Sequence, residues 1–95
     1  MSKVILSGYI VVPEGELESV IAELPGHISD TRNEPGCLIF EVTQRTGHPN
    51  IFDVYEEFVD KEAFSMHQSR VKNSKWGQIT KNVERHYEIK DENDI

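Results

Sequence analysis

Histidine, glutamate and arginine side chains that fall in otherwise apolar segments are the residues of this sequence best suited to acid–base chemistry. His67 follows Phe64 and precedes Val71 at helical spacing, so it lies on the apolar face of a predicted helix. An imidazole has a pKa near neutrality and can accept or donate a proton at physiological pH. We therefore treat His67 as a candidate catalytic base, with a structural histidine at the edge of the core as the alternative.

The other three histidines differ in their predicted surroundings. His27 follows Pro25-Gly26 and borders the apolar face of an earlier predicted helix, so its ring either points into a cavity and binds substrate or is partly exposed. His48 lies in a predicted hairpin loop, and His86 alternates with exposed strand positions. Both are predicted to be surface residues.

Glu56 and Arg85 are charged residues on predicted strand faces that are otherwise apolar. Strand alternation puts Glu56 on the face of Val54 and Phe58. A buried charge needs a partner, so we predict an ion pair between Glu56 and Arg85. This pair would either line a pocket and orient a polar substrate group or stabilise the fold or an interface.

Arg70, Phe40, Tyr55 and Trp76 complete the set of candidate substrate-binding residues. Arg70 lies three residues after His67, and its guanidinium could bind an anionic substrate group or remain solvated. The three aromatic side chains could form the walls of a cavity or simply fill the core.

The histidines form no H-x-x-x-H or E-x-x-H pair, and the sequence has neither a glycine-rich phosphate loop nor a G-x-S-x-G segment. We therefore expect no metal site and no hydrolase. One cysteine among 95 residues excludes an internal disulfide.

The charge of the chain limits its partners. Seventeen acidic and 10 basic residues give a formal net charge of −7, which argues against nucleic acid and anionic membranes as partners. No apolar run approaches the roughly 18–20 residues of a membrane span, and the first residues lack a secretory pattern. The sequence is therefore typical of a cytoplasmic protein.

Hydrophobic periodicity predicts the elements that must position these residues. Segments rich in β-branched and aromatic residues predict strands at 4–12, 37–45, 51–58 and 83–90, the middle two joined by a five-residue hairpin loop. Apolar residues at helical spacing predict a helix from about residue 14 to 32, with a kink or break at Pro25-Gly26. Asp60 should cap a second helix, and Ser74 a short third one.

The predicted order is β-α-β-β-α-β, an α+β ferredoxin-like plan with an antiparallel sheet and helices on one face. The uncovered sheet face carries apolar residues, and pairing two such faces would give a homodimeric α+β barrel. Residues 1–90 form a single domain in this interpretation, and 91–95 an acidic tail.

Several segments resemble a known family. At residues 31–42 the sequence TRNEPGCLIFEV resembles the TR-x-EPGC-x-x-(F/Y)-E-V signature of antibiotic-biosynthesis-monooxygenase domains. VYEEF at 54–58 and AFSMH at 63–67 resemble the family's x-Y-E-x-(F/W)…A-(F/L)-x-x-H segment. His27 is similar to the histidine of an LP-x-HI stretch in one branch of the family. The C-terminal segments SKWG at 74–77 and RHYEI at 85–89 resemble the C-terminal part of the sequences of that branch.

The resemblance implies a ferredoxin-like, usually dimeric domain. Several members oxidise quinols, anthrones or similar aromatic compounds with O₂ and without metal or flavin, whereas others degrade haem or isomerise small phosphorylated sugars. The haem-degrading branch uses an Asn, a Trp and a His where this chain has Gly8, His67 and, nearby, Gly77. This departure argues against haem chemistry.

The resulting hypothesis is a monooxygenase that uses no cofactor, with a small organic molecule and O₂ as partners. His67 would remove a proton from a phenol or hydroquinone, giving an anion able to reduce O₂. The alternatives are a non-redox isomerase or decarboxylase of a small polar metabolite, with His67 and Arg70 as its working groups, and a non-catalytic dimer that binds a small molecule.

Overall fold

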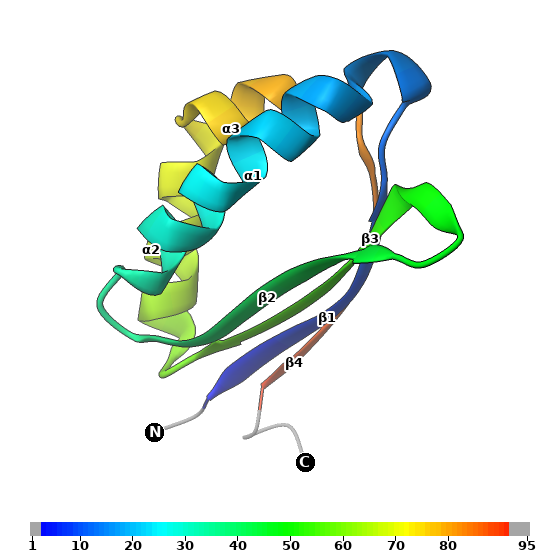
Figure 1. Ribbon diagram of the computed structural model, residues 1–95. Helices are drawn as coiled ribbons and strands as arrows, with labels where there is room; N and C mark the ends of the chain where they lie inside the picture. Colours follow the sequence, from blue (N-terminus) through cyan, green and yellow to red (C-terminus); the bar gives the residue numbers. More distant parts are fainter. Residues whose placement is uncertain (1–2, 92–95) are drawn as a thin grey trace.

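The structure is a computed structural model that describes residues 3–91. Its strands form one antiparallel sheet in the order β2-β3-β1-β4 (Figure 1). Their bounds are β1 (Val4–Val11), β2 (Cys37–Arg45), β3 (His48–Phe58) and β4 (Glu84–Asp91). Central β1 pairs with both β3 and β4, which are far apart in the sequence. This topology confirms the predicted ferredoxin-like α+β fold.

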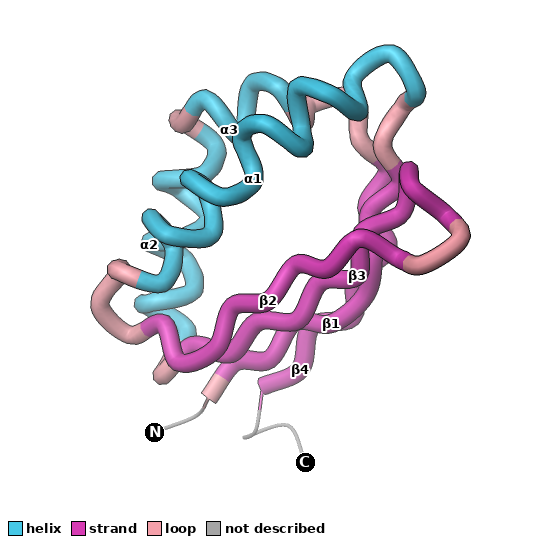
Figure 2. Tube along the Cα trace, viewed as in Figure 1, coloured by secondary structure: helices cyan, strands magenta, loops and turns pink. Residues whose placement is uncertain are grey.

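The helices form a second layer on one face of the sheet, with the strands together beneath them (Figure 2). They are the short 3₁₀ turn η1 (Glu14–Glu16), α1 (Leu17–Arg32), α2 (Lys61–Lys72) and α3 (Lys75–Ile79). Asp60 caps α2 by accepting a hydrogen bond from the Ala63 amide at 2.8 Å, and the Ser74 side chain caps α3, as predicted. No helix within residues 3–91 is long and apolar enough to cross a membrane.

Helix α1 does not break where the sequence predicted a kink or break. It remains one helix through Pro25 and Gly26 up to Arg32. Val20 and His27, on either side of the proline, are both buried. Packing of both halves in the same core therefore outweighs the lost backbone hydrogen bond at Pro25.

The connection between β2 and β3 is shorter than the predicted five-residue loop. Only Thr46 and Gly47 lie between the strands, and Arg45 is the partner of His48 in the register. Gly47 has a φ of +81°, a backbone conformation that favours glycine and closes a tight turn. The prediction was wrong because residues 48–50, assigned to a loop from their turn-forming types, extend β3 instead.

The core lies between the inner face of the sheet and the helices. Its fully or nearly fully buried members include Leu6, Ile10, Val12, Val20, Phe52, Val54, Trp76 and Val83. The opposite face carries half-buried side chains such as Tyr9, whose ring stacks on His86 at 4.6 Å between centroids. The expectation of a dimer rests on the apolar residues of this uncovered face and stays a prediction.

Gly8 allows β4 to lie close against β1. Its φ is +152°, and a Cβ atom built on it would lie 1.9 Å from the backbone oxygen of His86. Any side chain at this position would push the two strands apart. Because β4 supplies one wall of the site described below, this glycine positions that wall.

Candidate functional site

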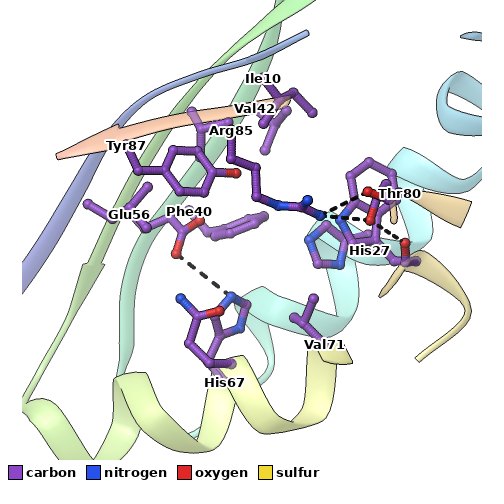
Figure 3. A pocket seen from close by; sticks show the side chains of 14 residues that line it. Ile10, His27, Phe40, Val42, Glu56, His67, Val71, Thr80, Arg85 and Tyr87 are labelled. Atoms are coloured by element: carbon purple, nitrogen blue, oxygen red, sulfur yellow. Dashed lines mark hydrogen bonds and ion pairs between the residues drawn. The ribbon is translucent and has the colours of Figure 1, made fainter. Parts of the chain in front are cut away.

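A cavity of about 200 Å³ lies between the helices and the inner face of the sheet (Figure 3). Leu6, Ile10, Val42, Val54 and Val71 contribute apolar walls. The structure brings six of the eight candidate site residues together around this cavity: His27, Phe40, Glu56, His67, Trp76 and Arg85. Their roles in binding or catalysis stay predictions.

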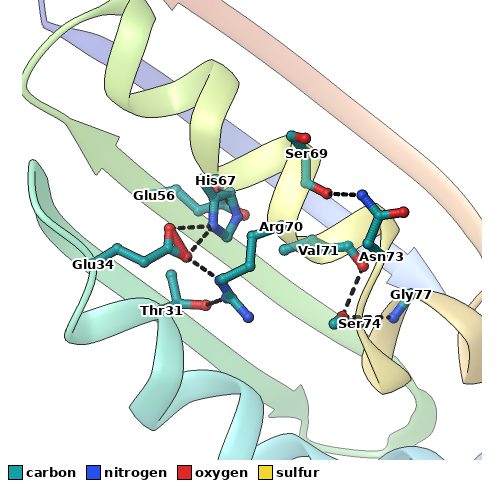
Figure 4. Close-up of polar contacts among 10 residues, drawn as sticks. All are labelled: Thr31, Glu34, Glu56, His67, Ser69, Arg70, Val71, Asn73, Ser74 and Gly77. Carbon is teal, nitrogen blue, oxygen red and sulfur yellow. Dashed lines mark hydrogen bonds and ion pairs between the residues drawn. The ribbon is translucent and has the colours of Figure 1, made fainter.

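His67 projects from α2 and is 4% exposed. Its Nδ1 lies 2.9 Å from the nearer oxygen of Glu34, which stands in the turn between α1 and β2 (Figure 4). A carboxylate can only accept a hydrogen bond, so this contact places the ring proton on Nδ1 and leaves Nε2 as the basic nitrogen. Burial lowers the pKa of His67 despite the opposing effect of Glu34, so the ring is neutral at pH 7.

Arg70 is not among the residues that line the cavity. Its Nε donates to the Glu34 carboxylate at 2.8 Å, and a terminal nitrogen donates to the Thr31 hydroxyl at 3.0 Å. The prediction that Arg70 binds an anionic substrate group is therefore not supported by its position. Its guanidinium instead holds Glu34, which in turn holds His67.

Glu56 reaches the cavity from β3, and its carboxyl group points toward His67 (Figure 3). The distance from Nε2 of His67 to Oε1 of Glu56 is 3.7 Å, longer than a hydrogen bond. Burial, reinforced by the negative charge of Glu34, raises the pKa of Glu56 to about 8. At neutral pH the cavity therefore holds an uncharged carboxylic acid beside an uncharged imidazole.

The predicted Glu56–Arg85 ion pair is not formed. Arg85 donates instead to the hydroxyl of Thr80 at 3.1 Å and to backbone oxygens of Thr80 and Val83. Both residues still line the same cavity, as strand alternation predicted. Glu56 needs no cation because it is protonated, and Arg85 is satisfied by acceptors at the end of α3 and in the turn before β4.

His27 belongs to an aromatic cluster in the wall of the cavity. Its ring stacks on Trp76 with centroids 4.4 Å apart and makes an edge contact with Phe40 at 5.3 Å. Burial lowers the pKa of His27 to about 3, with smaller contributions from His67 and Arg70. The ring is therefore a neutral wall of the cavity over the whole physiological pH range.

Of the tyrosines on β3 and β4, Tyr87 lines the cavity and Tyr55 does not. Tyr55 alternates with Glu56 on β3 and lies on the outer face, where its hydroxyl donates to Glu57, so its assignment to the cavity was wrong. Tyr87 on β4 lines the cavity instead, and burial raises the pKa of its hydroxyl to about 12.

No three His, Cys, Asp or Glu side chains within residues 3–91 are grouped closely enough to hold a metal ion. The polar side chains of the cavity are arranged instead as hydrogen-bonding and proton-transfer groups, with Glu34, His67 and Glu56 in a row.

Comparison with known proteins places the chain in a family. The model of the family described as antibiotic biosynthesis monooxygenase matches residues 3–76, most of the chain. The chain belongs to this family. A comparison with curated proteins gives no significant match.

Solved structures of similar proteins share the fold. A Bacteroides thetaiotaomicron protein named "putative antibiotic biosynthesis monooxygenase" is 26% identical, with a TM-score of 0.75 over 95% of this chain and 86% of that one. A protein from Shewanella oneidensis is also 26% identical, with a TM-score of 0.69 over 95% and 87% of the two chains. Another antibiotic biosynthesis monooxygenase is 20% identical, with a TM-score of 0.69 over 96% and 95%.

Sequence reasoning missed four residues of this family member's site: Glu34, Thr80, Gln68 and Tyr87. Glu34 had a signal, since it is the acidic residue of the EPGC motif, but nothing local showed that it meets His67. Thr80 and Gln68 line the cavity without any such signal. Tyr87 shares a strand face with Arg85, and this alternation could have identified it.

Proposed function

We propose that this antibiotic biosynthesis monooxygenase family member is a cofactor-independent monooxygenase that oxidises a small phenolic or quinol-type compound with O₂. One observation carries the proposal. His67 is buried with Nδ1 bound to Glu34, so that its unprotonated Nε2 faces a cavity with apolar and aromatic walls. This is the arrangement required of a base that ionises a weakly acidic hydroxyl group.

The chemistry needs no electron source besides the substrate. His67 takes the hydroxyl proton, and the resulting anion gives one electron to O₂. The two radicals combine at a ring carbon to form a peroxide. Loss of the hydrogen on that carbon breaks the O–O bond, leaving a carbonyl oxygen on the ring. The second oxygen departs as water with the hydroxyl proton and the ring hydrogen, so the substrate supplies all four electrons that reduce O₂.

The size and lining of the cavity support a small aromatic substrate. A cavity of about 150 Å³ lined by apolar side chains can hold benzene, so about 200 Å³ fits one substituted ring. Phe40 and the His27–Trp76 stack offer ring faces and edges against which such a molecule can pack. Apolar surroundings also favour the electron-rich anion as a reductant, because they solvate it weakly.

The same geometry gives a specific reason to keep a non-redox reaction as the second candidate. A neutral imidazole and a neutral carboxylic acid whose nearest atoms are 3.7 Å apart can together remove and return protons, as an isomerase requires. A phosphorylated substrate is disfavoured, because Arg70 is engaged by Glu34 and Thr31. A neutral polar metabolite remains compatible with the cavity.

Oxygen uptake during turnover separates these candidates. Purified protein would be incubated with hydroquinone, catechol and substituted phenols, with dissolved O₂ and substrate loss recorded together. We expect one O₂ to be consumed per substrate, and His67→Gln to reduce the rate at least about a hundredfold because it removes the base. His48→Gln is the matched control, since His48 is exposed in β3 far from the cavity. Substrate conversion that continues under argon would refute the monooxygenase function and support the non-redox reaction.

A further inference from the structure

Glu56 is a buried acid that the reaction above does not use. It is 5% exposed, and its Oε1 atom accepts no hydrogen bond from any residue of the part of the chain that the structure describes. Leaving a buried polar atom unpaired is costly, so an atom without a partner within the protein usually has one from outside the chain, such as water or a bound molecule. Because Glu56 lines the cavity, that partner can be a bound molecule.

The groups around Glu56 favour its uncharged form. His67 faces it from α2, and Glu34 adds a negative charge from beyond His67. The remaining titratable or charged groups near it are Cys37 on β2, Tyr87 and Arg85 on β4, and, across the cavity, His27 on α1. Arg85 is the only cation among them, and its guanidinium donates to Thr80 and Val83. Nothing in this environment compensates a charge on Glu56.

We propose that Glu56 is a second catalytic residue, a carboxylic acid that donates a hydrogen bond to the same substrate oxygen from which His67 takes a proton. The separation of 3.7 Å between Oε1 and Nε2 suits this role. It is too long for a direct hydrogen bond, yet an oxygen placed in the cavity can lie about 2.8 Å from both atoms. The substrate hydroxyl would then donate to Nε2 and accept from Glu56.

This role rests on the proposed function, and its proton-transfer step is balanced. The O–H bond of the substrate breaks and an N–H bond forms at Nε2 of His67, with no electron transfer. The substrate becomes an oxyanion, which the O–H group of Glu56 stabilises by a charge-assisted hydrogen bond. The new imidazolium is stabilised on its other side by the Glu34 carboxylate.

The first test measures binding of hydroquinone under argon, where oxidation cannot occur. Calorimetric titrations at pH 7, 8 and 9 would compare the parent with Glu56→Gln. Hydroquinone stays protonated over most of this range because phenols have a pKa of about 10. Burial holds the pKa of His67 below its ordinary value of 6.5, so His67 stays neutral from pH 7 upward and Glu56 is the group facing the substrate oxygen that changes its charge. With half-ionisation near pH 8, we expect the affinity of the parent to fall about tenfold from pH 7 to pH 9.

Glu56→Gln should bind with an affinity that does not vary over this pH range, since an amide cannot ionise. Glu41→Gln is the matched control because Glu41 is an exposed strand residue outside the cavity, and it should follow the parent. A fall in affinity that persists in Glu56→Gln would overturn the proposal, as would failure of the parent to bind hydroquinone at any pH. Thermal unfolding of each variant establishes that it is folded.

Infrared spectroscopy gives a readout that is independent of binding. The parent at pH 7 should show the C=O band of a protonated, buried carboxyl group, and Glu56→Gln should lack it. A parent spectrum without this band at pH 7 would also overturn the proposal. Binding with the expected pH dependence but without O₂ uptake would instead refute the monooxygenase function and leave Glu56 as a substrate-binding acid.

Discussion

The Glu34 carboxylate lies 2.9 Å from Nδ1 of His67, although the two residues are 33 positions apart in the sequence. Glu34 also accepts a hydrogen bond from Arg70, so its position is set from two directions. Its side chain is 14% exposed, and water competes weakly for it. The orientation of the proposed base therefore depends on a residue in the turn before β2, outside the helix that carries His67.

Removal of Glu34 should change the tautomer of His67. In Glu34→Ala, Nδ1 loses its acceptor, and we expect a mixture of the two neutral tautomers and a loss of about 1–3 kcal/mol of stability from the unpaired buried donor. Imidazole ¹⁵N chemical shifts would report the tautomer directly. Glu34→Gln retains an acceptor and should keep the proton on Nδ1. Glu62→Ala, at an exposed position of α2, should change neither shift, and an unaltered His67 spectrum in Glu34→Ala would contradict the assignment.

Glu56 should make the protein less stable as the pH rises. Its pKa is about 8 in the folded chain against an ordinary value of 4.5, so between these limits the native state holds a proton that the unfolded state has lost. Its contribution to stability is full below pH 4.5 and is lost by pH 8, at about 1.4 kcal/mol per pH unit. Urea unfolding of Glu56→Gln from pH 5 to 8 should lack this decline. Parallel curves for parent and variant would contradict the burial argument.

His27 should contribute the opposite dependence at acid pH. Its pKa is lowered from 6.5 to about 3, so below pH 6.5 the unfolded chain binds a proton that the native chain does not. This stabilising contribution is present above pH 6.5 and is lost as the pH falls toward 3. In His27→Phe, which can keep the stack on Trp76, the slope between pH 4 and 6 should be smaller by about 1.4 kcal/mol per unit. His48→Gln, an exposed histidine, should retain the slope of the parent.

Replacement of Gly8 and of Gly26 by alanine should change the stability of the protein in opposite directions. Gly8→Ala places a Cβ atom against the His86 oxygen, and we expect a loss on the order of 1–3 kcal/mol with wider spacing between β1 and β4. Gly26→Ala meets no atom within 4 Å inside α1 and should stabilise by about 0.5–1 kcal/mol. Thermal unfolding compares the two. A neutral Gly8→Ala variant would contradict the close approach of the strands.

The outer face of the sheet should form a homodimer. We expect light scattering at micromolar concentration to give twice the chain mass of 10.9 kDa. Ile5 lies on this face in the central strand β1, and Ile5→Glu should raise the dissociation constant at least about a hundredfold by burying a charge. Met66→Glu, at an exposed position of α2, should remain dimeric. A monomeric parent would refute the barrel arrangement.

The faces of the strands could be predicted because side chains alternate with a period of two. This pattern correctly placed Glu56 and Arg85 on the inner face. It also places Tyr55 on the opposite face from its neighbour Glu56. The prediction of Tyr55 as a cavity residue was therefore wrong, because its side chain lies on the outer face with Glu57.

The partners of the charged residues could not be predicted, because contacts across the fold select them. Glu56 and Arg85 needed compensation, but Glu56 is protonated and Arg85 binds Thr80. No local pattern joins Glu34 to His67 or Arg70 to Thr31. Likewise, the turn-forming residues 48–50 and the Pro25-Gly26 step suggested interruptions that strand pairing and core packing override.

The row of Glu34, His67 and Glu56 has one further consequence, for the movement of charge. Arg70 already neutralises Glu34, so with neutral His67 and protonated Glu56 the resting cluster is electroneutral. When a neutral substrate gives its proton to His67, an imidazolium and an oxyanion form side by side and the total remains zero. The only displacement is that of one proton over the length of a hydrogen bond. An acidic protein can therefore generate a reducing anion in its interior without admitting a counterion or rearranging water.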